Sequence, residues 1–139
     1  MSRVTVTRRV RFEAAHRLWS TVLDEAANEA TYGKCAREGG HGHNYEVEVT
    51  VEGQPDPRSG LIVVRPELDA AIAEHLVDKC DHRDLDQVIG HDTVSTGENL
   101  ARIFFDWLEP HVPSPARLAR VRVYETPRNI FDAFAREGS

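Results

Sequence analysis

The sequence lacks long apolar runs, has few cysteines and carries no excess of positive charge, and each absence excludes a class of protein. No stretch approaches the roughly 18 apolar residues that cross a bilayer, so we expect no contact with membranes. Two cysteines in 139 residues, with no recognisable secretion signal, are expected to be reduced thiols rather than a disulfide. With 23 acidic and 17 basic residues the net charge is −6, which argues against a nucleic-acid partner.

The length and composition fit one folded domain. A chain of 139 residues that is 40% hydrophobic suits a single domain, 1–139, with one core. The first residues alternate in polarity and form no apolar block, so we expect no signal peptide and a cytoplasmic protein. The sequence contains neither repeats nor a linker long enough to divide it.

The polarity pattern predicts an α+β fold. Alternation of polar and apolar residues predicts strands, and apolar residues three to four positions apart predict helices. The predicted strands cover 3–17, 41–52, 118–126 and 129–137, and the predicted helices cover 66–79 and 95–110. We expect the two helices on one face of an antiparallel sheet, and we expect the sheet to associate because its edges and one face are uncovered.

The connections between these elements are less regular. Residues 61–65 fit a short strand or an extended segment, and 80–92 reads as a loop. Residues 19–40 form a long connection with one expected helical turn, and connections of this length are usually functional. Ser95 and Glu98 fit a capping box at the start of the second long helix.

Three histidines lie in the apolar phase of the first two strands. His41 and His43, two residues apart, point to the same side, and His16 joins them if the strands pair. Three separate core histidines would each cost desolvation without a shared partner, whereas a metal supplies one. Imidazole suits zinc, and three protein ligands leave the fourth position open, as in catalytic sites.

Cys35 allows two interpretations. As a fourth ligand it would make the zinc site structural. As a free thiol, close in sequence to Lys34 and Arg37, it would have a lowered pKa and act in catalysis. Cys80 follows apolar residues of a helix and is expected to be a small core residue.

The remaining candidate site residues are the Asp81–His82 pair, Glu125 and Thr96. The Asp81–His82 pair fits either a solvated turn or a proton-transfer pair. Glu125 shares the buried phase of its strand and needs a partner, either an arginine or a ligand with adjacent N–H donors. Thr96 lies at a helix start, where free backbone N–H groups could meet a ligand.

Several segments together resemble the 6-pyruvoyltetrahydropterin synthase family. They are "FEAAHRL", "GKCAREGGHGHNYEVEVTV", "DPRSGLIVV", "DHRDLD", "STGENLARIFFDWL" and "VRVYETPRNI", and they extend over nearly the whole chain. The resemblance implies the tunnelling fold (T-fold), in which subunits join their sheets into an oligomeric barrel. The implied assembly is a homohexamer of two trimers.

The resemblance also implies roles for the candidate residues. His16, His41 and His43 would bind zinc, Cys35 would be the catalytic thiol, and Asp81 and His82 would transfer protons. Glu125 would anchor the pterin ring with help from the backbone near Thr96. The implied reaction converts 7,8-dihydroneopterin triphosphate to 6-pyruvoyltetrahydropterin with loss of triphosphate. Arg17, Lys34 and Arg37 are candidate cations for the triphosphate.

Two alternatives stay open at this point. The related 6-carboxytetrahydropterin synthases share the fold and histidines but usually have a shorter gap between the cysteine and His-Gly-His; five residues separate Cys35 from His41 here. Gly97 departs from the threonine often found in the pyruvoyl enzymes. A non-catalytic zinc- or pterin-binding scaffold is the second alternative, against which the intact set of Cys35, Asp81 and His82 argues.

Overall fold

The computed structural model describes residues 3–137 and contains one five-stranded sheet in the order β3-β1-β2-β4-β5. Strands β1 (Val4–His16) and β2 (His41–Gly53) pair antiparallel along their whole length. On the other side of β2, β4 (Arg117–Thr126) and then β5 (Asn129–Phe134) continue the antiparallel pairing. The two-residue β3 (Arg83–Asp84) runs parallel to the end of β1.

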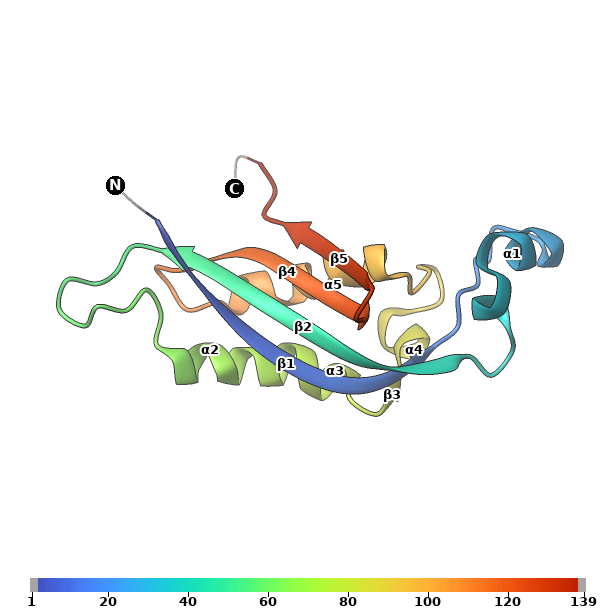
Figure 1. Cartoon of the computed structure of the whole chain (residues 1–139), viewed down its shortest axis with the longest axis horizontal. Helices are drawn as coiled ribbons and strands as arrows, with labels where there is room; N and C mark the ends of the chain where they lie inside the picture. The colour runs from blue at the N-terminus through green and yellow to red at the C-terminus, as the bar shows by residue number, and fades with distance from the viewer. Residues whose placement is uncertain (1–2, 138–139) are drawn as a thin grey trace.

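The longer helices lie on one face of this sheet (Figure 1). One is a continuous segment of α2 (Arg65–Ile72), the π-helical turn η2 (Ala73–Val77) and α3 (Asp78–Cys80). The other is α5 (Gly97–Leu108), which ends in the 3₁₀ turn η3 (Glu109–His111). Within residues 3–137 no helix is long and apolar enough to cross a membrane.

The core lies between the helices and the sheet. The apolar phase of β2 supplies Val47, Val49 and Val51, and the helices supply Leu68 and Phe104, all buried. Burial of these side chains is the main favourable term in folding. The predicted α+β architecture, with two helical segments on one face of an antiparallel sheet, is confirmed.

Short elements surround the end of the sheet where β1 ends and β2 begins. Helix α1 (Glu25–Tyr32) and the 3₁₀ turn η1 (Gly33–Ala36) lie in the long connection between these strands, where one helical turn was expected. Helix α4 (Leu85–Ile89) follows β3 directly. All three lie near this end in Figure 1.

Three local predictions need correction. Residues 61–65 form neither a strand nor a continuous extended segment: buried Ile62 and Val63 lie in a bend, and Arg65 begins α2. Residues 80–92 are not a plain loop, because β3 pairs with distant β1 and Asp84 caps α4. Ser95 does not cap α5: Thr96 does so, by accepting a hydrogen bond from the backbone N–H of Asn99.

Candidate metal centre and its surroundings

The register of β1 and β2 brings the three histidines together. His16 lies opposite His41, and His43 lies opposite Ala14, two residues along the same face. The ring centroids are 4.7 Å apart for His16 and His41, 5.1 Å for His16 and His43, and 4.7 Å for His41 and His43. One nitrogen from each ring lies within 4.8 Å of the others, so one ion can contact all three.

The chemistry of these side chains fits a metal ion. The Nε2 atom of His43 is buried and has no hydrogen-bond partner among the described residues, and such an atom is costly unless a ligand satisfies it. Burial lowers the pKa of both His41 and His43, which keeps the imidazoles neutral and able to coordinate. Three converging imidazoles form a donor set that suits zinc.

The orientation of His16 is set by the start of α5. Its Nδ1 lies 2.9 Å from the carbonyl oxygen of Ser95. A carbonyl oxygen only accepts hydrogen bonds, so Nδ1 must carry the proton in this contact. Nε2 is then the nitrogen that can coordinate an ion. Metal-bound histidines commonly use their second nitrogen in this way, which fixes tautomer and ring direction.

Glu125 faces the histidines from the end of β4. Its Oε2 lies 3.5 Å from Nε2 of His16, and Asn129 donates a hydrogen bond of 3.1 Å to Oε1. The partner expected from sequence was an arginine or a ligand; the observed partners are His16 and Asn129. The hydroxyl of buried Tyr45 lies 3.4 Å from the same Nε2, and burial raises the pKa of Tyr45, so it stays protonated.

Cys35 lies in η1 and is half-buried. Its carbonyl oxygen accepts a 2.7 Å hydrogen bond from the backbone N–H of Leu18, and the next carbonyl, of Ala36, accepts one of 2.7 Å from Nε of Arg17. The turn that carries the thiol is therefore held by the two residues that follow His16. Among residues 3–137, the cluster of side chains able to share an ion consists of the three histidines without Cys35.

Asp81 and His82 lie beside β1 rather than in a free turn. The backbone N–H of His82 donates to the carbonyl of Glu13 at 2.6 Å, and Oδ1 of Asp81 accepts from the N–H of Glu13 at 3.1 Å. His82 has a left-handed backbone, φ 58°, and its exposed ring lies 3.7 Å from Oδ2 of Asp81. His82 and His43 line the same open groove.

Comparison with known proteins decides the family. A model of the family described as "6-pyruvoyl tetrahydropterin synthase" matches residues 5–135. The chain belongs to this family. Relatives named "6-pyruvoyl tetrahydrobiopterin synthase" are 42% identical in Drosophila melanogaster and 41% identical in Homo sapiens, each over 127 residues. These matches cover 90% of this chain and 76% and 87% of the relatives.

The backbone fold agrees with that of a solved 6-pyruvoyl tetrahydropterin synthase. The solved structure of the Caenorhabditis elegans 6-pyruvoyl tetrahydropterin synthase superimposes with a TM-score of 0.92 at 40% identity, covering 98% of both chains. A Plasmodium vivax structure of the same name has a TM-score of 0.69 at 15% identity and shows the fold alone. The predicted family and its T-fold are confirmed.

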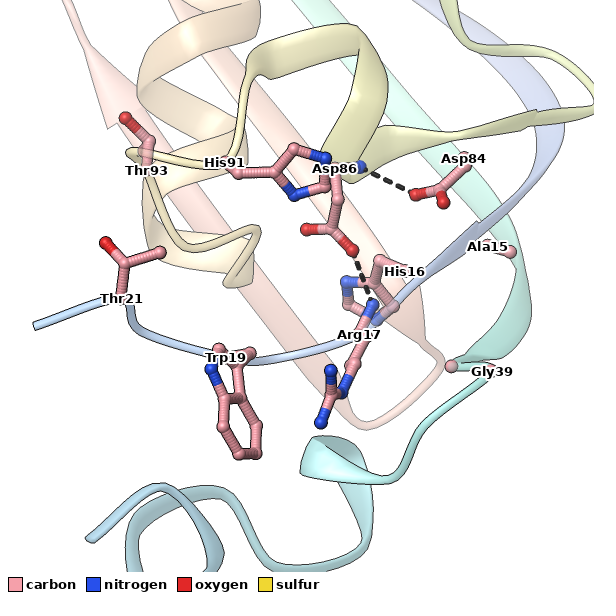
Figure 2. Close-up of a pocket in the computed structure, with 11 residues that line it drawn as sticks. Ala15, His16, Arg17, Trp19, Thr21, Gly39, Asp84, Asp86, His91 and Thr93 are labelled. Atoms are coloured by element: carbon pink, nitrogen blue, oxygen red, sulfur yellow. Dashed lines mark hydrogen bonds between the residues drawn. The ribbon is translucent and has the colours of Figure 1, made fainter. Parts of the chain in front are cut away.

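Beside His16, the end of β1 borders a cavity of about 230 Å³ (Figure 2). Arg17 and Trp19 line one side, with the guanidinium 4.1 Å from the centre of the indole ring. Asp84, Asp86 and His91 line another side. Arg17, a candidate cation for the triphosphate, thus donates a hydrogen bond from Nε to the carbonyl oxygen of Ala36 and places its guanidinium over the Trp19 ring.

The sequence predictions did not include Asp86, and they gave Ser95 only a capping role, although both lie near the candidate metal centre. The available signal was that Ser95 precedes a second capping residue, Thr96, so its own side chain was free for another partner. Glu98, the other half of the predicted capping box, is exposed.

Proposed function

We propose that this protein is a zinc-dependent lyase that converts 7,8-dihydroneopterin triphosphate to 6-pyruvoyltetrahydropterin and releases triphosphate. The observation that carries the proposal is the convergence of three imidazoles, with the Glu125 carboxylate 3.5 Å from Nε2 of His16, in a chain of this family. The relatives at about 40% identity bear the corresponding enzyme name, which favours this product over the 6-carboxy alternative.

His16, His41 and His43 would hold the ion and leave a position open for substrate oxygens. When bound, zinc would supply Lewis acidity, which polarises those oxygens and acidifies the adjacent C–H and O–H groups. Because the redox change is internal to the substrate, no redox cofactor is needed.

Cys35 is the proposed proton carrier. Its turn is fixed to the residues after His16 and its thiol is absent from the histidine cluster, which supports a thiol beside the metal rather than on it. Asp81 and His82 are the proposed partners in proton transfer, and the groove that His82 shares with His43 supports this role for His82. A positioned acid or base contributes about 10²–10⁴-fold to rate.

Glu125 is the proposed anchor of the pterin ring. Its carboxylate is mostly buried, with 15% of the side chain exposed, and its one neutral donor, Asn129, leaves it able to accept from ring N–H groups. Charge-assisted hydrogen bonds of this kind are about twice as strong as neutral ones. The backbone near Thr96 would contribute further contacts, because the first N–H groups of α5 have no partners within the helix.

The proposed assembly is a homohexamer of two trimers. The sheet supports association because β5 is an edge strand with partly exposed Ile130 and Phe134, and unpaired edges favour pairing with another chain. The proposed partner is otherwise only the small-molecule substrate, and the proposed compartment is the cytoplasm.

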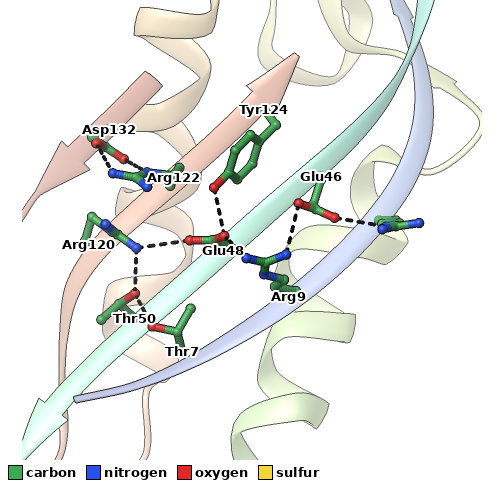
Figure 3. A network of polar contacts seen from close by, with 10 residues as sticks. Thr7, Arg9, Glu46, Glu48, Thr50, Arg120, Arg122, Tyr124 and Asp132 are labelled. Atoms are coloured by element: carbon green, nitrogen blue, oxygen red, sulfur yellow. Dashed lines mark hydrogen bonds and ion pairs between the residues drawn. The ribbon is translucent and has the colours of Figure 1, made fainter. Parts of the chain in front are cut away.

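The face of the sheet without helices carries a polar network (Figure 3). Glu48 is only 4% exposed and pairs with Arg9 at 3.0 Å, Arg120 at 3.1 Å and the hydroxyl of Tyr124 at 2.9 Å. This buried carboxylate therefore has three donors within one subunit, which favours the strand edges over Glu48 as the proposed contacts between subunits.

The test is incubation of the purified, zinc-loaded protein with 7,8-dihydroneopterin triphosphate and identification of products by mass. We expect 6-pyruvoyltetrahydropterin and triphosphate, with zinc at about one ion per subunit. His43→Ala serves as the control that lacks a ligand. Dominance of 6-carboxytetrahydropterin and acetaldehyde would replace this function by the sister activity, and no turnover of a metal-loaded protein would support the scaffold alternative.

A further inference from the structure

Asp86, in α4, makes side-chain contacts with two other parts of the chain. Its Oδ1 accepts a hydrogen bond of 2.6 Å from the hydroxyl of Ser95, at the start of α5. Its Oδ2 accepts one of 2.7 Å from the backbone N–H of Arg17, at the end of β1 (Figure 2). Both contacts lead to His16, which precedes Arg17 in the chain and contacts Ser95 in space.

Ser95 connects the carboxylate to the imidazole. Its side chain is fully buried, its carbonyl oxygen accepts from Nδ1 of His16 at 2.9 Å, and its hydroxyl lies 3.3 Å from the same nitrogen. The hydrogen bond to Asp86 anchors buried Ser95 beside His16 and so restrains the position of the carbonyl that accepts from Nδ1. The arrangement resembles the carboxylate–histidine pairs behind zinc ligands, with one residue inserted.

We propose that Asp86 is a positioning residue of the metal centre, which acts through Ser95 and through the backbone of Arg17 to hold Nε2 of His16 toward His41 and His43. The inference rests on the proposed metal-dependent function. Because the Ser95 hydroxyl donates its proton to Asp86, its oxygen faces Nδ1 of His16 as an acceptor. This favours the His16 tautomer with the proton on Nδ1, which leaves Nε2 able to bind a cation.

The same anchor extends to the thiol. Asp86 fixes the backbone of Arg17, whose side chain holds the carbonyl of Ala36, and the next residue, Leu18, holds the carbonyl of Cys35. The Asp86 carboxylate therefore helps to hold the backbone between a proposed metal ligand, His16, and the turn that carries the proposed proton carrier, Cys35. Loss of Asp86 is expected to loosen both.

The experiment compares Asp86→Asn, Ser95→Ala and their double variant with Asp84→Asn in the full chain. Asp84 is the matched control: it lines the same cavity, and it caps α4 through a hydrogen bond from the N–H of Asp86 that asparagine retains. Zinc affinity is measured by competition with a chromophoric chelator, the absorption spectrum of the Co²⁺-loaded protein reports ligand geometry, and thermal melts of the metal-free proteins report stability.

Asp86→Asn is expected to weaken zinc binding about 10- to 100-fold and to alter the Co²⁺ spectrum, while Asp84→Asn changes neither. Ser95→Ala is expected to lose part of this affinity, because it retains the carbonyl that accepts from His16. The double variant is expected to bind no more weakly than Asp86→Asn, since both residues act along one path.

Equal zinc affinity and equal Co²⁺ spectra for Asp86→Asn and Asp84→Asn, in a wild-type protein that binds metal, would overturn the inference alone. If Asp86→Asn does not fold, Ser95→Ala decides: an affinity equal to that of Asp84→Asn overturns the inference, and a lower one supports it. A wild-type protein that binds no metal would overturn the proposed function together with the inference.

Discussion

Gly97, the first residue of α5, has no room for a side chain. A Cβ built at this position lies 2.5 Å from Cζ of Phe131 in β5 and closer still to two other ring carbons. Carbon atoms prefer separations of about 3.5–4.0 Å, so the ring or the helix must move. We predict that Gly97→Ala destabilises the protein because of the contact with Phe131.

The magnitude is a balance of two effects. Alanine is more favourable than glycine within a helix by about 1 kcal/mol. Overpacking of a filled site costs about 1–3 kcal/mol, and the half-buried ring of Phe131 can turn aside, which keeps the cost within that range. The expected net loss of unfolding free energy is about 1 kcal/mol, within a range of about 0–2 kcal/mol.

Urea denaturation at one fixed protein concentration measures this loss, because association would make stability depend on concentration. Gly53→Ala is the matched control: its Cβ would meet Ile62 at an ordinary 3.5 Å, so little change is expected. In a Phe131→Leu background, Gly97→Ala should cost less, since the shorter side chain leaves space. Equal midpoints for Gly97→Ala and Gly53→Ala, or the same loss in both backgrounds, would refute the steric explanation.

Three further predictions concern the site and the acid stability. Cys35→Ala should retain metal and fold but lose about 10²–10⁴-fold in turnover, whereas His43→Ala should lose metal and activity together; comparable metal loss in both variants would reverse their assigned roles. Glu125→Gln should raise KM more than it lowers kcat, because the charge proposed to face the pterin N–H groups is lost while the shape remains. An unchanged KM in steady-state kinetics would contradict the role of Glu125 as the anchor of the pterin ring. Hydrogen bonds from Arg122 lower the pKa of Asp132, so this pair stabilises the fold above the unfolded pKa of about 3.9 and the contribution is lost as pH falls through the lower folded pKa. Melting temperatures of Asp132→Asn should therefore depend less on pH than those of the wild type in this acid range, and identical pH dependence would argue against the pair.

Local sequence patterns determined the main elements and the candidate metal ligands. Alternation with period two assigned β1, β2, β4 and β5, and helical spacing assigned α2 and α5, because these periods place apolar side chains on one face whatever the rest of the chain does. The same period placed His16, His41 and His43 on the buried side of two strands. The resemblance then supplied the family and roles for Cys35, Asp81, His82, Glu125 and Thr96, which remain proposals.

Only the tertiary structure decided the contacts between residues far apart in the chain. The pairing of β3 with β1, the hydrogen bonds of Asp86 and Ser95 to the end of β1, and the ring of Phe131 over Gly97 all join segments whose separation in sequence carries no periodic signal. The sequence assigned Ser95 to a helix cap because local hydrogen bonding is all that a local pattern can describe. Folding buried its hydroxyl beside Asp86, and a buried donor takes the acceptor that the packed chain brings within reach.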